Sequence, residues 1–204
     1  MDARTRRGEQ TRSRILDATR ALLVEHGQDL TLAAIARRLG VTKQAVLYHY
    51  STKEAVLVEL GLRAYEAEAD CAVAAVAKAR GPKAIKAYAE ALLSFYLEDL
   101  ERFRLLYLRA QMYKNTLEWF PTEVREKRLY PTTGRMYGAV EAAMKRGKLR
   151  RGTDARATVV AVHMAVIGIA TMYGLTNDEG DAMVQPIEAY LAAMINAWMR
   201  GVAP

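Results

Sequence analysis

The segment TLAAIARRLGVTKQAVLYHYSTK, residues 31–53, constrains the fold of this chain more than any other segment. It contains two short runs of apolar residues at helical spacing, and Gly40 between them can adopt the left-handed conformation that a tight turn requires. Thr31 and Thr42 stand just before the two runs, and threonine commonly caps helix N-termini. The segment therefore predicts two short helices joined by a tight turn, which is the helix-turn-helix motif.

The second helix of this motif has an apolar side and a polar side. Offsets of three and four residues place Val46 and Tyr50 on the inner side, together with Val41 in the turn. The outer side carries polar and aromatic residues instead of the Glu and Lys of an ordinary solvent-exposed helix, namely Lys43, Gln44, Leu47 and Tyr48. A helix with such a face can enter the major groove of DNA.

Each residue type on the outer side suits a particular contact with DNA. Gln44 can form two hydrogen bonds with a base edge, adenine being favoured, while Lys43 can reach a guanine or a phosphate and Leu47 a thymine methyl group. The next helix is expected to begin with the capping box of residues 51–54, and Lys53 lies in its first turn, where the helix dipole favours a phosphate. The predicted DNA-binding residues are Thr31, Thr42, Lys43, Gln44, Leu47, Tyr48, His49 and Lys53.

The same motif could also be an ordinary packed helix pair with a solvated basic face. The turn, the caps, the polar face and the terminal lysine coincide within one stretch, however, and this coincidence favours DNA binding. The distribution of charge agrees with this interpretation. Residues 1–53 contain ten Lys and Arg and five Asp and Glu, so this segment carries a net charge of +5 out of +7 for the whole chain. A local excess of positive charge favours contact with phosphate.

From about Arg12 to Leu60 the chain resembles the DNA-binding domain of the TetR (tetracycline repressor) family. The resemblance rests on the first-helix pattern ILDATRALLVEHG and on the following TLAAIARRLGVTKQAVLYHYSTKEAVL. It covers about the first quarter of the chain, and beyond it only the layout of helices agrees. The family usually has Leu-Tyr where this chain has Val46-Leu47, so one of two tyrosines facing the DNA backbone is replaced. The resemblance implies phosphate contacts for Tyr48 and His49.

Composition indicates a globular protein, since 51% of the 204 residues are apolar and the chain is long enough to bury a substantial core. Its one cysteine, Cys71, excludes an internal disulfide framework. That thiol could be a redox sensor, although a small packed residue is the simpler interpretation. The charged N-terminus does not look like a signal peptide, so we expect a cytoplasmic protein.

The pattern as a whole predicts an all-α protein of about nine helices. We expect a DNA-binding domain over residues 1–53 and a helical ligand-binding and dimerisation domain over residues 54–204. Residues 1–9 are polar and aperiodic, which indicates a flexible arm that could lie along DNA or remain untethered. A helix over residues 51–79 would belong to both domains and could couple them, because no Gly- or Pro-rich linker separates them. Pro131 predicts a kink or break in a later helix.

Residues 159–175, VVAVHMAVIGIATMYGL, are apolar nearly all round the predicted helix. A membrane span is one interpretation, but the segment is of borderline length and carries His163 in its middle. A soluble helix of this kind must be covered on every side. We therefore expect a homodimer that pairs the helices over about 153–175 and 181–199, as the TetR resemblance also implies, rather than a monomer with this helix in its core. A dimer would read a palindrome.

Aromatic and methionine residues are frequent in the second domain, where the resemblance implies a pocket for a small-molecule effector. Each of them could equally be plain core. His163 is the best polar candidate, since it is a titratable group on an apolar helix. The predicted pocket residues are Phe95, Phe103, Tyr107, Tyr113, Trp119, Tyr137 and His163.

No pattern for catalysis or for metal binding is present in the sequence. The three histidines are far apart, and neither a Gly-rich phosphate loop nor a GxSxG motif occurs. We therefore predict no enzyme, no metal and no cofactor, but a sequence-specific transcriptional regulator, most simply a repressor released from its operator by a small molecule. A helical adaptor with a vestigial DNA-binding domain and a non-specific DNA binder are the alternatives.

Overall fold

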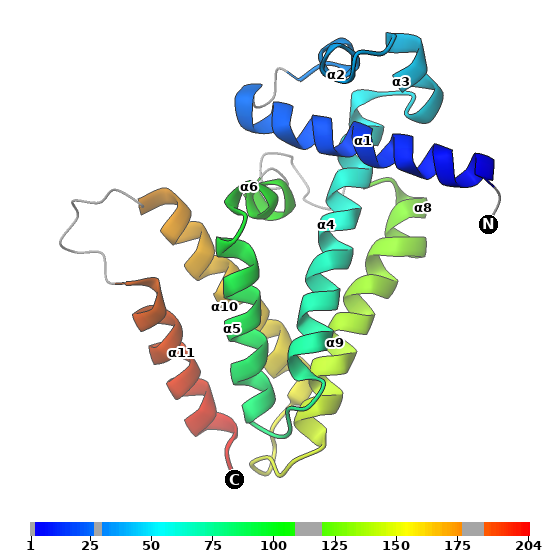
Figure 1. The fold of residues 1–204 in the computed structure, drawn as a ribbon. Coiled ribbons are helices and arrows are strands. Elements are labelled where there is room, and N and C mark those ends of the chain that lie inside the picture. The colour runs from blue at the N-terminus through cyan, green and yellow to red at the C-terminus, as the bar shows by residue number, and fades with distance from the viewer. Residues whose placement is uncertain (1–2, 27–29, 109–119, 177–185) are drawn as a thin grey trace. The chain divides into compact units, whose positions relative to one another are not determined.

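The computed structural model describes residues 3–26, 30–108, 120–176 and 186–204. All regular secondary structure in these residues is helical, which confirms the predicted all-α fold (Figure 1). The chain forms two compact units, Met1–Arg63 and Ala64–Pro204, and the boundary falls within helix α4 (Lys53–Val76). The predicted domain boundary after residue 53 stays a prediction.

The first unit is built on α1 (Ala3–His26), which packs against α2 (Leu32–Leu39) and α3 (Lys43–His49) (Figure 1). Its buried side chains include Ile15, Leu16, Leu22, Ile35 and Val46. The predicted flexible arm over residues 1–9 is wrong for residues 3–9, which form the first turns of α1. These turns propagate from a helix that is anchored further on by its buried face, and adding residues to an existing helix costs little.

The turn between α2 and α3 has the geometry that its residues predict. The Thr31 hydroxyl accepts a hydrogen bond from the Ala34 N–H at 3.1 Å, and the Thr42 hydroxyl caps α3 in the same way at 3.1 Å. Gly40 has φ 67° and ψ 32°, and the following Val41 N–H donates to a carbonyl in the last turn of α2 at 3.0 Å. The left-handed glycine thus ends α2 and directs the chain into α3.

Two details of the predicted motif are wrong. Val41 lies outside the core with 42% of its side chain exposed, because helical offsets do not govern a residue that belongs to neither helix. The residue that caps α4 is Thr52 and not Ser51, since the Thr52 hydroxyl accepts a hydrogen bond from the Ala55 N–H at 3.0 Å. The extended backbone of Tyr50 delays the start of α4, so the expected capping box is not formed.

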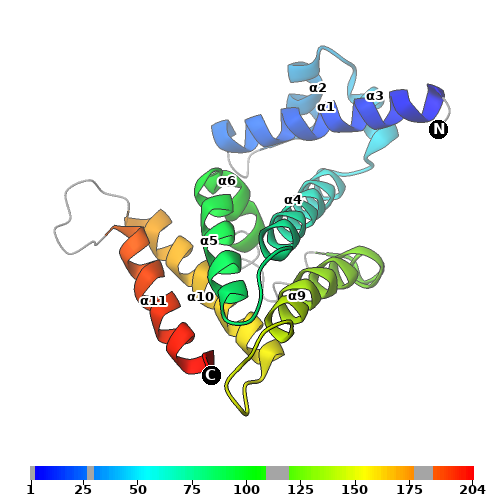
Figure 2. The same cartoon turned by 60° about the horizontal axis from the view of Figure 1, so that its bottom comes forward.

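The second unit is organised around α5 (Lys83–Leu97), which packs against α9 (Tyr130–Lys145), α10 (Ala155–Thr176) and α11 (Ile187–Val202) (Figure 2). One side of α10 is fully buried at spacings of three and four residues, namely Val159, Val162, Val166 and Ala170. Large aromatic side chains fill the space beside α5, among them Tyr88, Tyr96 and Phe103.

Two π-helical turns interrupt the regular helices of this unit. The first, η2 (Arg104–Leu108), follows the short α6 (Leu100–Phe103). The second, η3 (Arg125–Leu129), joins α8 (Thr122–Val124) to α9.

The second π-helical turn replaces the break that was predicted at Pro131. Proline lacks an N–H, and its ring would clash with a carbonyl of the preceding turn of a regular α-helix. Pro131 stands at the start of α9, directly after η3, and the wider turn of a π-helix accommodates it. The chain is therefore helical without interruption from residue 122 to residue 145.

The end of α9 is held against the segment that precedes α5 by a close contact between glycines. A Cβ atom on Gly147 would lie 2.6 Å from the Gly81 Cα, which leaves no room for a side chain. The Gly81 N–H donates to the Ala143 carbonyl at 3.0 Å, and the Arg146 guanidinium donates to the Val76 carbonyl at 3.0 Å. These two hydrogen bonds hold together the end of α4, the segment that precedes α5 and the end of α9.

Helix α10 is long and apolar enough to cross a membrane over residues 155–173, with a mean hydropathy of 1.6, and no other described helix is. One of its sides lies in the core of the second unit, as a soluble helix requires. The other side exposes large apolar side chains, with Met164 at 60% and Met172 at 59% exposure. Only one side of the helix is therefore covered within a single chain.

Replacing Gly40 by alanine should lower the free energy of unfolding by about 1 kcal/mol, because a Cβ atom disfavours the left-handed conformation. No atom lies within 4 Å of the added Cβ, so the loss would be conformational rather than steric. Thermal unfolding measures it. Gly8→Ala is the matched control, since Gly8 lies within α1 with open space around it and alanine should stabilise a helix by up to about 1 kcal/mol. Equal stability of Gly40→Ala and the wild type would contradict the expectation.

Candidate functional site

The predicted DNA-binding residues all lie on the surface of the first unit, on α3 and at the starts of α2 and α4. Tyr48 is 77% exposed. Those exposed to solvent are Thr31, Thr42, Lys43, Gln44 and Tyr48. Leu47, His49 and Lys53 are partly buried. The inner side of α3 is anchored by the fully buried Val46.

The two capping threonines, Thr31 and Thr42, cap helices and also have a hydroxyl proton that can be donated. Their oxygens accept backbone hydrogen bonds at the starts of α2 and α3. Each hydroxyl keeps its own proton, which can be donated to a phosphate oxygen. Because α3 has no acidic residue in its first turn, the partial positive charge of its N-terminus is not offset there. Thr42 and Lys43 therefore stand at a point that favours an anion.

His49 is held mainly in its neutral form. Partial burial lowers the pKa of its imidazole, and the positive charge of Arg12 on α1 lowers it further. The ring of His49 packs edge-on against that of Tyr48, with 5.1 Å between the centroids. Neutral His49 can donate one N–H to a phosphate. Arg12 is thus a basic group beside α3 that the helix-turn-helix pattern by itself does not reveal, because it comes from another helix.

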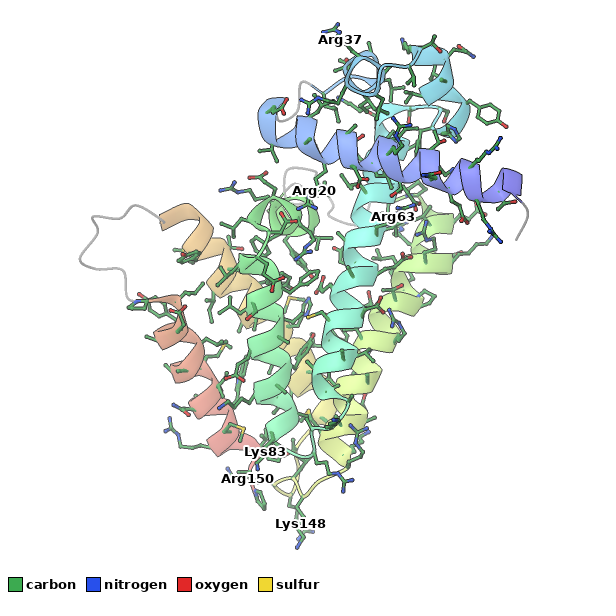
Figure 3. The ribbon with its side chains drawn as sticks, viewed as in Figure 1. Arg20, Arg37, Arg63, Lys83, Lys148 and Arg150 are labelled. Atoms are coloured by element: carbon green, nitrogen blue, oxygen red, sulfur yellow. The ribbon has the colours of Figure 1, made fainter. Side chains whose placement is uncertain are left out.

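Further arginines line the end of α2. The Arg37 side chain extends away from the helix into solvent (Figure 3). Arg38 forms an ion pair with Glu25 of α1, and the carboxylate partly neutralises its positive charge. Positive charge therefore stands next to the exposed face of α3 from two neighbouring helices.

The second unit contains a buried polar cluster around Glu68 of α4. Glu68 has no exposed surface, and His163 of α10 is 4% exposed. The Tyr96 hydroxyl donates to a Glu68 carboxylate oxygen at 2.8 Å, and the Tyr107 hydroxyl lies 2.8 Å from both oxygens. Three elements, α4, α5 and η2, thus supply one hydrogen-bonded group.

His163 joins this group to Tyr88. Its Nδ1 lies 2.7 Å from the Tyr88 hydroxyl, and its Nε2 lies 3.2 Å from the Tyr107 hydroxyl. Each hydroxyl has a single proton, so one arrangement satisfies every group when Glu68 is ionised. Tyr88 donates to Nδ1, the Nε2–H donates to Tyr107, and Tyr107 and Tyr96 donate to Glu68.

Burial shifts the titration of both charged members of the cluster. It raises the pKa of Glu68 to about 7, although the hydrogen bonds from Tyr107 and Tyr96 and the charge of Arg102 act in the opposite direction. It lowers the pKa of His163 to about 4. At neutral pH the histidine is therefore uncharged, and Glu68 is divided between its protonated and ionised forms.

Three of the predicted pocket residues meet in this cluster. The ring of His163 lies 6.1 Å from that of Tyr107 and 5.3 Å from that of Tyr137. Phe103 packs beside Tyr107 at 5.5 Å, whereas Phe95 packs on Tyr96 outside the hydrogen-bonded group. Tyr113 and Trp119 lie outside the described residues.

The buried cluster also contains Glu68, Tyr88 and Tyr96, which are not in the list of predicted pocket residues. The sequence holds a signal for Glu68, because the apolar Ala64 and Ala72 stand four residues to either side of it and therefore share its side of the helix. An acidic residue on the apolar face of a helix requires partners. Nothing in the sequence marks Tyr88 and Tyr96 as those partners, since they come from a different helix.

No group of three or more His, Cys, Asp or Glu side chains that could hold a metal ion occurs within the described ranges. Cys71 is partly buried, and burial raises the pKa of its thiol. The thiol is therefore mostly protonated at neutral pH, which makes it a poor nucleophile.

Residues 15–60 match the model of the bacterial regulatory proteins of the tetR family. The chain is also 48% identical over 50 residues to the HTH-type transcriptional regulator SrpR of Pseudomonas putida. That match covers 24% of this chain and 24% of SrpR, so the chain spans about a quarter of the length of this curated relative. The family match lies within the first unit, which holds the helix-turn-helix.

Solved structures resemble the chain over nearly its whole length. A TetR family transcription regulator from Marinobacter aquaeolei VT8 is 16% identical with a TM-score of 0.68, over 97% of this chain and 98% of that one. SmeT, the repressor of the Stenotrophomonas maltophilia multidrug efflux pump SmeDEF, is 20% identical with a TM-score of 0.66, over 94% and 89%. These likenesses concern the fold.

The buried cluster should give the protein a characteristic dependence of stability on pH. Folded Glu68 keeps its proton up to about pH 7, whereas the unfolded side chain loses it near 4.5. This proton therefore stabilises the fold fully at low pH, and the contribution is lost as the pH rises to about 7. Glu68→Gln removes this loss, so the stability of the variant relative to wild type should rise by on the order of 3 kcal/mol over that range.

Chemical denaturation at a series of pH values measures this difference. His163 provides the opposite control, because its ordinary pKa of 6.5 is lowered to about 4 in the fold and its contribution is lost as the pH falls between these values. The difference between His163→Asn and wild type should therefore slope the other way. Parallel profiles for all three proteins would show that neither group titrates as described.

Proposed function

We propose that this chain, which belongs to the tetR family of bacterial regulatory proteins, is a cytoplasmic repressor that a small molecule releases from a palindromic DNA operator. The observation that carries the proposal is the exposed face of α3, where Lys43, Gln44 and Tyr48 stand on a helix anchored by a buried valine. A short helix with this face fits the major groove. Gln44 would read a base, and the surrounding threonines and basic residues would hold phosphates.

A homodimer would complete the reading of DNA. The methionines Met164 and Met172 of α10 and Tyr190 of α11 are large apolar side chains exposed to solvent, on two helices that contact each other. Exposed apolar side chains on neighbouring helices would favour a protein interface. Pairing α10 and α11 of two copies would cover the surface and give two recognition helices related by a two-fold axis.

The effector would act through the buried cluster of the second unit. Its members come from α4, α5, η2 and α10, so a molecule that binds among them would change the packing of several helices at once. The helix that carries Glu68 also begins with Lys53 of the proposed DNA-binding set. Ligand binding would then favour a state of the dimer that no longer matches the operator, which is a shift of population between two states. The repressor SmeT offers a precedent for the direction of control.

Selection of DNA from a random pool by the purified protein, followed by sequencing of the bound fraction, tests the proposal. A palindrome in the bound fraction supports a dimeric regulator that reads sequence. Bound DNA without enrichment would identify a non-specific binder. No binding at all would favour an adaptor that has lost its contact with DNA.

Substitutions separate the base-reading role from the phosphate-binding role. Gln44→Ala should lose about 1–3 kcal/mol of binding to the selected site and relax the preference at one position of each half-site. Lys53→Ala should weaken binding to every sequence alike, because phosphates carry no sequence information. Fluorescence anisotropy with the selected site and with scrambled DNA measures both effects. An equal effect of Gln44→Ala on the two DNAs would make its assignment wrong.

Met164→Glu should dissociate the proposed dimer, because it would bury a charge at the centre of an apolar interface. Sedimentation velocity should then show a monomer, and binding to the palindrome should weaken at least about tenfold through the loss of the second half-site. Val24→Glu is the matched control, since Val24 is 59% exposed on α1 and lies on neither interface helix. A dimeric Met164→Glu protein would exclude α10 from the interface.

A further inference from the structure

Glu68 is a buried carboxylate without a fixed positive partner. The structure records no ion pair between it and any lysine or arginine among the described residues. The nearest nitrogen of a basic side chain in an ion-pair contact is the His163 Nε2 at 3.6 Å, and burial keeps that ring neutral. Arg102 acts on Glu68 only through space, because its guanidinium donates to the Phe95 carbonyl and lies 4.0 Å from an Asp99 oxygen. Hydrogen bonds and the more distant charge of Arg102 stabilise the negative charge, but no cation is in contact with the carboxylate among the described residues.

Aromatic rings surround this carboxylate. The ring of Tyr107 lies 5.6 Å from that of Tyr96 and 6.1 Å from that of Tyr65, and Tyr137 extends the group through His163. The face of an aromatic ring carries partial negative charge and attracts cations, more strongly where water is excluded. The cluster therefore combines a carboxylate with several aromatic rings, two kinds of group that attract a positive charge.

The turn that supplies Tyr107 is an irregular one. Tyr107 lies in the π-helical turn η2, and both oxygens of Glu68 are within 2.8 Å of its hydroxyl. Turns of this type are rare and are found frequently at functional sites. The Tyr107 hydroxyl thus contacts the carboxylate from a π-helical turn and not from a regular α-helix.

We propose that the effector site is centred on Glu68 and takes a hydrophobic organic cation, such as a quaternary ammonium or phosphonium compound, which binds among the rings of Tyr96, Tyr107 and Tyr137. This assignment rests on the proposed function, since it names the class of molecule that would release the repressor. The cation supplies the positive charge that the described residues do not provide. An anion would meet the carboxylate, and a neutral molecule would leave its charge without a partner.

Cation binding is coupled to the loss of a proton. In the absence of a ligand, a proton neutralises Glu68 in part of the molecules at neutral pH. An entering cation takes over this role, so the proton is released to the solvent. The titratable groups that face the carboxylate from the surrounding helices remain uncharged in this range, namely Tyr65, Tyr88, Tyr96, Tyr107, Tyr137 and His163.

Isothermal titration with tetraphenylphosphonium and with tetraphenylborate tests the proposal, because the two ions have nearly the same size and shape and opposite charge. The wild-type protein should bind the cation at least about tenfold more tightly than the anion. Affinity for the cation should rise about tenfold between pH 6 and pH 8, with release of a proton that is detected by comparing two buffers. Equal affinities for the two ions would overturn the proposal.

Glu68→Gln should bind the cation at least about tenfold more weakly than wild type and lose the dependence on pH, since the amide keeps the shape but not the charge. Glu90→Gln is the matched control, because Glu90 of α5 is 50% exposed and pairs with Lys86, and it should leave binding unchanged. Unchanged binding by Glu68→Gln would overturn the assignment.

Tyr107→Phe is a second test of the role of Glu68, for the case that Glu68→Gln does not fold. It retains the ring but removes a hydrogen bond that favours the ionised carboxylate, so the midpoint of the pH dependence should move upward. An unmoved midpoint would contradict the role of Glu68. The proposed function has a separate test in the binding of the selected DNA, measured without any cation, so the failure of one proposal can be told from the failure of the other.

Discussion

A carboxylate removed from water must find hydrogen bonds, and this requirement shapes the second unit. Glu68 has no exposed surface, and an unsatisfied charge in that place would cost several kcal/mol. Two tyrosine hydroxyls satisfy it, and the histidine that links one of them to Tyr88 extends the group to α10. The packing of α4, α5, η2 and α10 therefore brings together the groups that form hydrogen bonds with this carboxylate and with one another.

The first unit depends on interactions of much shorter range. The starts of α2 and α3 and the turn between them are secured by groups that lie three to five residues apart, namely the caps provided by Thr31 and Thr42 and the left-handed Gly40. A small three-helix unit formed in this way can present a rigid outer face on α3. Polar residues on that face do not contribute to the core, and their identities are left to the contact with a partner.

This difference in range explains which sequence-based expectations agree with the structure. The helix-turn-helix could be predicted, because apolar spacing, caps and a glycine all act within one turn of a helix. The errors at Val41 and at Ser51 concern the residues between helices, where periodicity gives no guidance. The prediction of a flexible arm is wrong for residues 3–9, because their polar composition gives no sign of a helix that is supported from further along the chain.

The sequence by itself determined the helices, the motif that presents α3, and the apolar character of α10, since each follows from residues close together in the chain. Only the tertiary structure decided that Glu68 and His163 belong to one group, because the hydrogen bond from Tyr88 to His163 joins residues 75 positions apart. It also decided that Pro131 follows a π-helical turn and that Arg12 acts on His49. Periodicity identifies the buried side of a helix, whereas the neighbours of that side depend on how the helices pack.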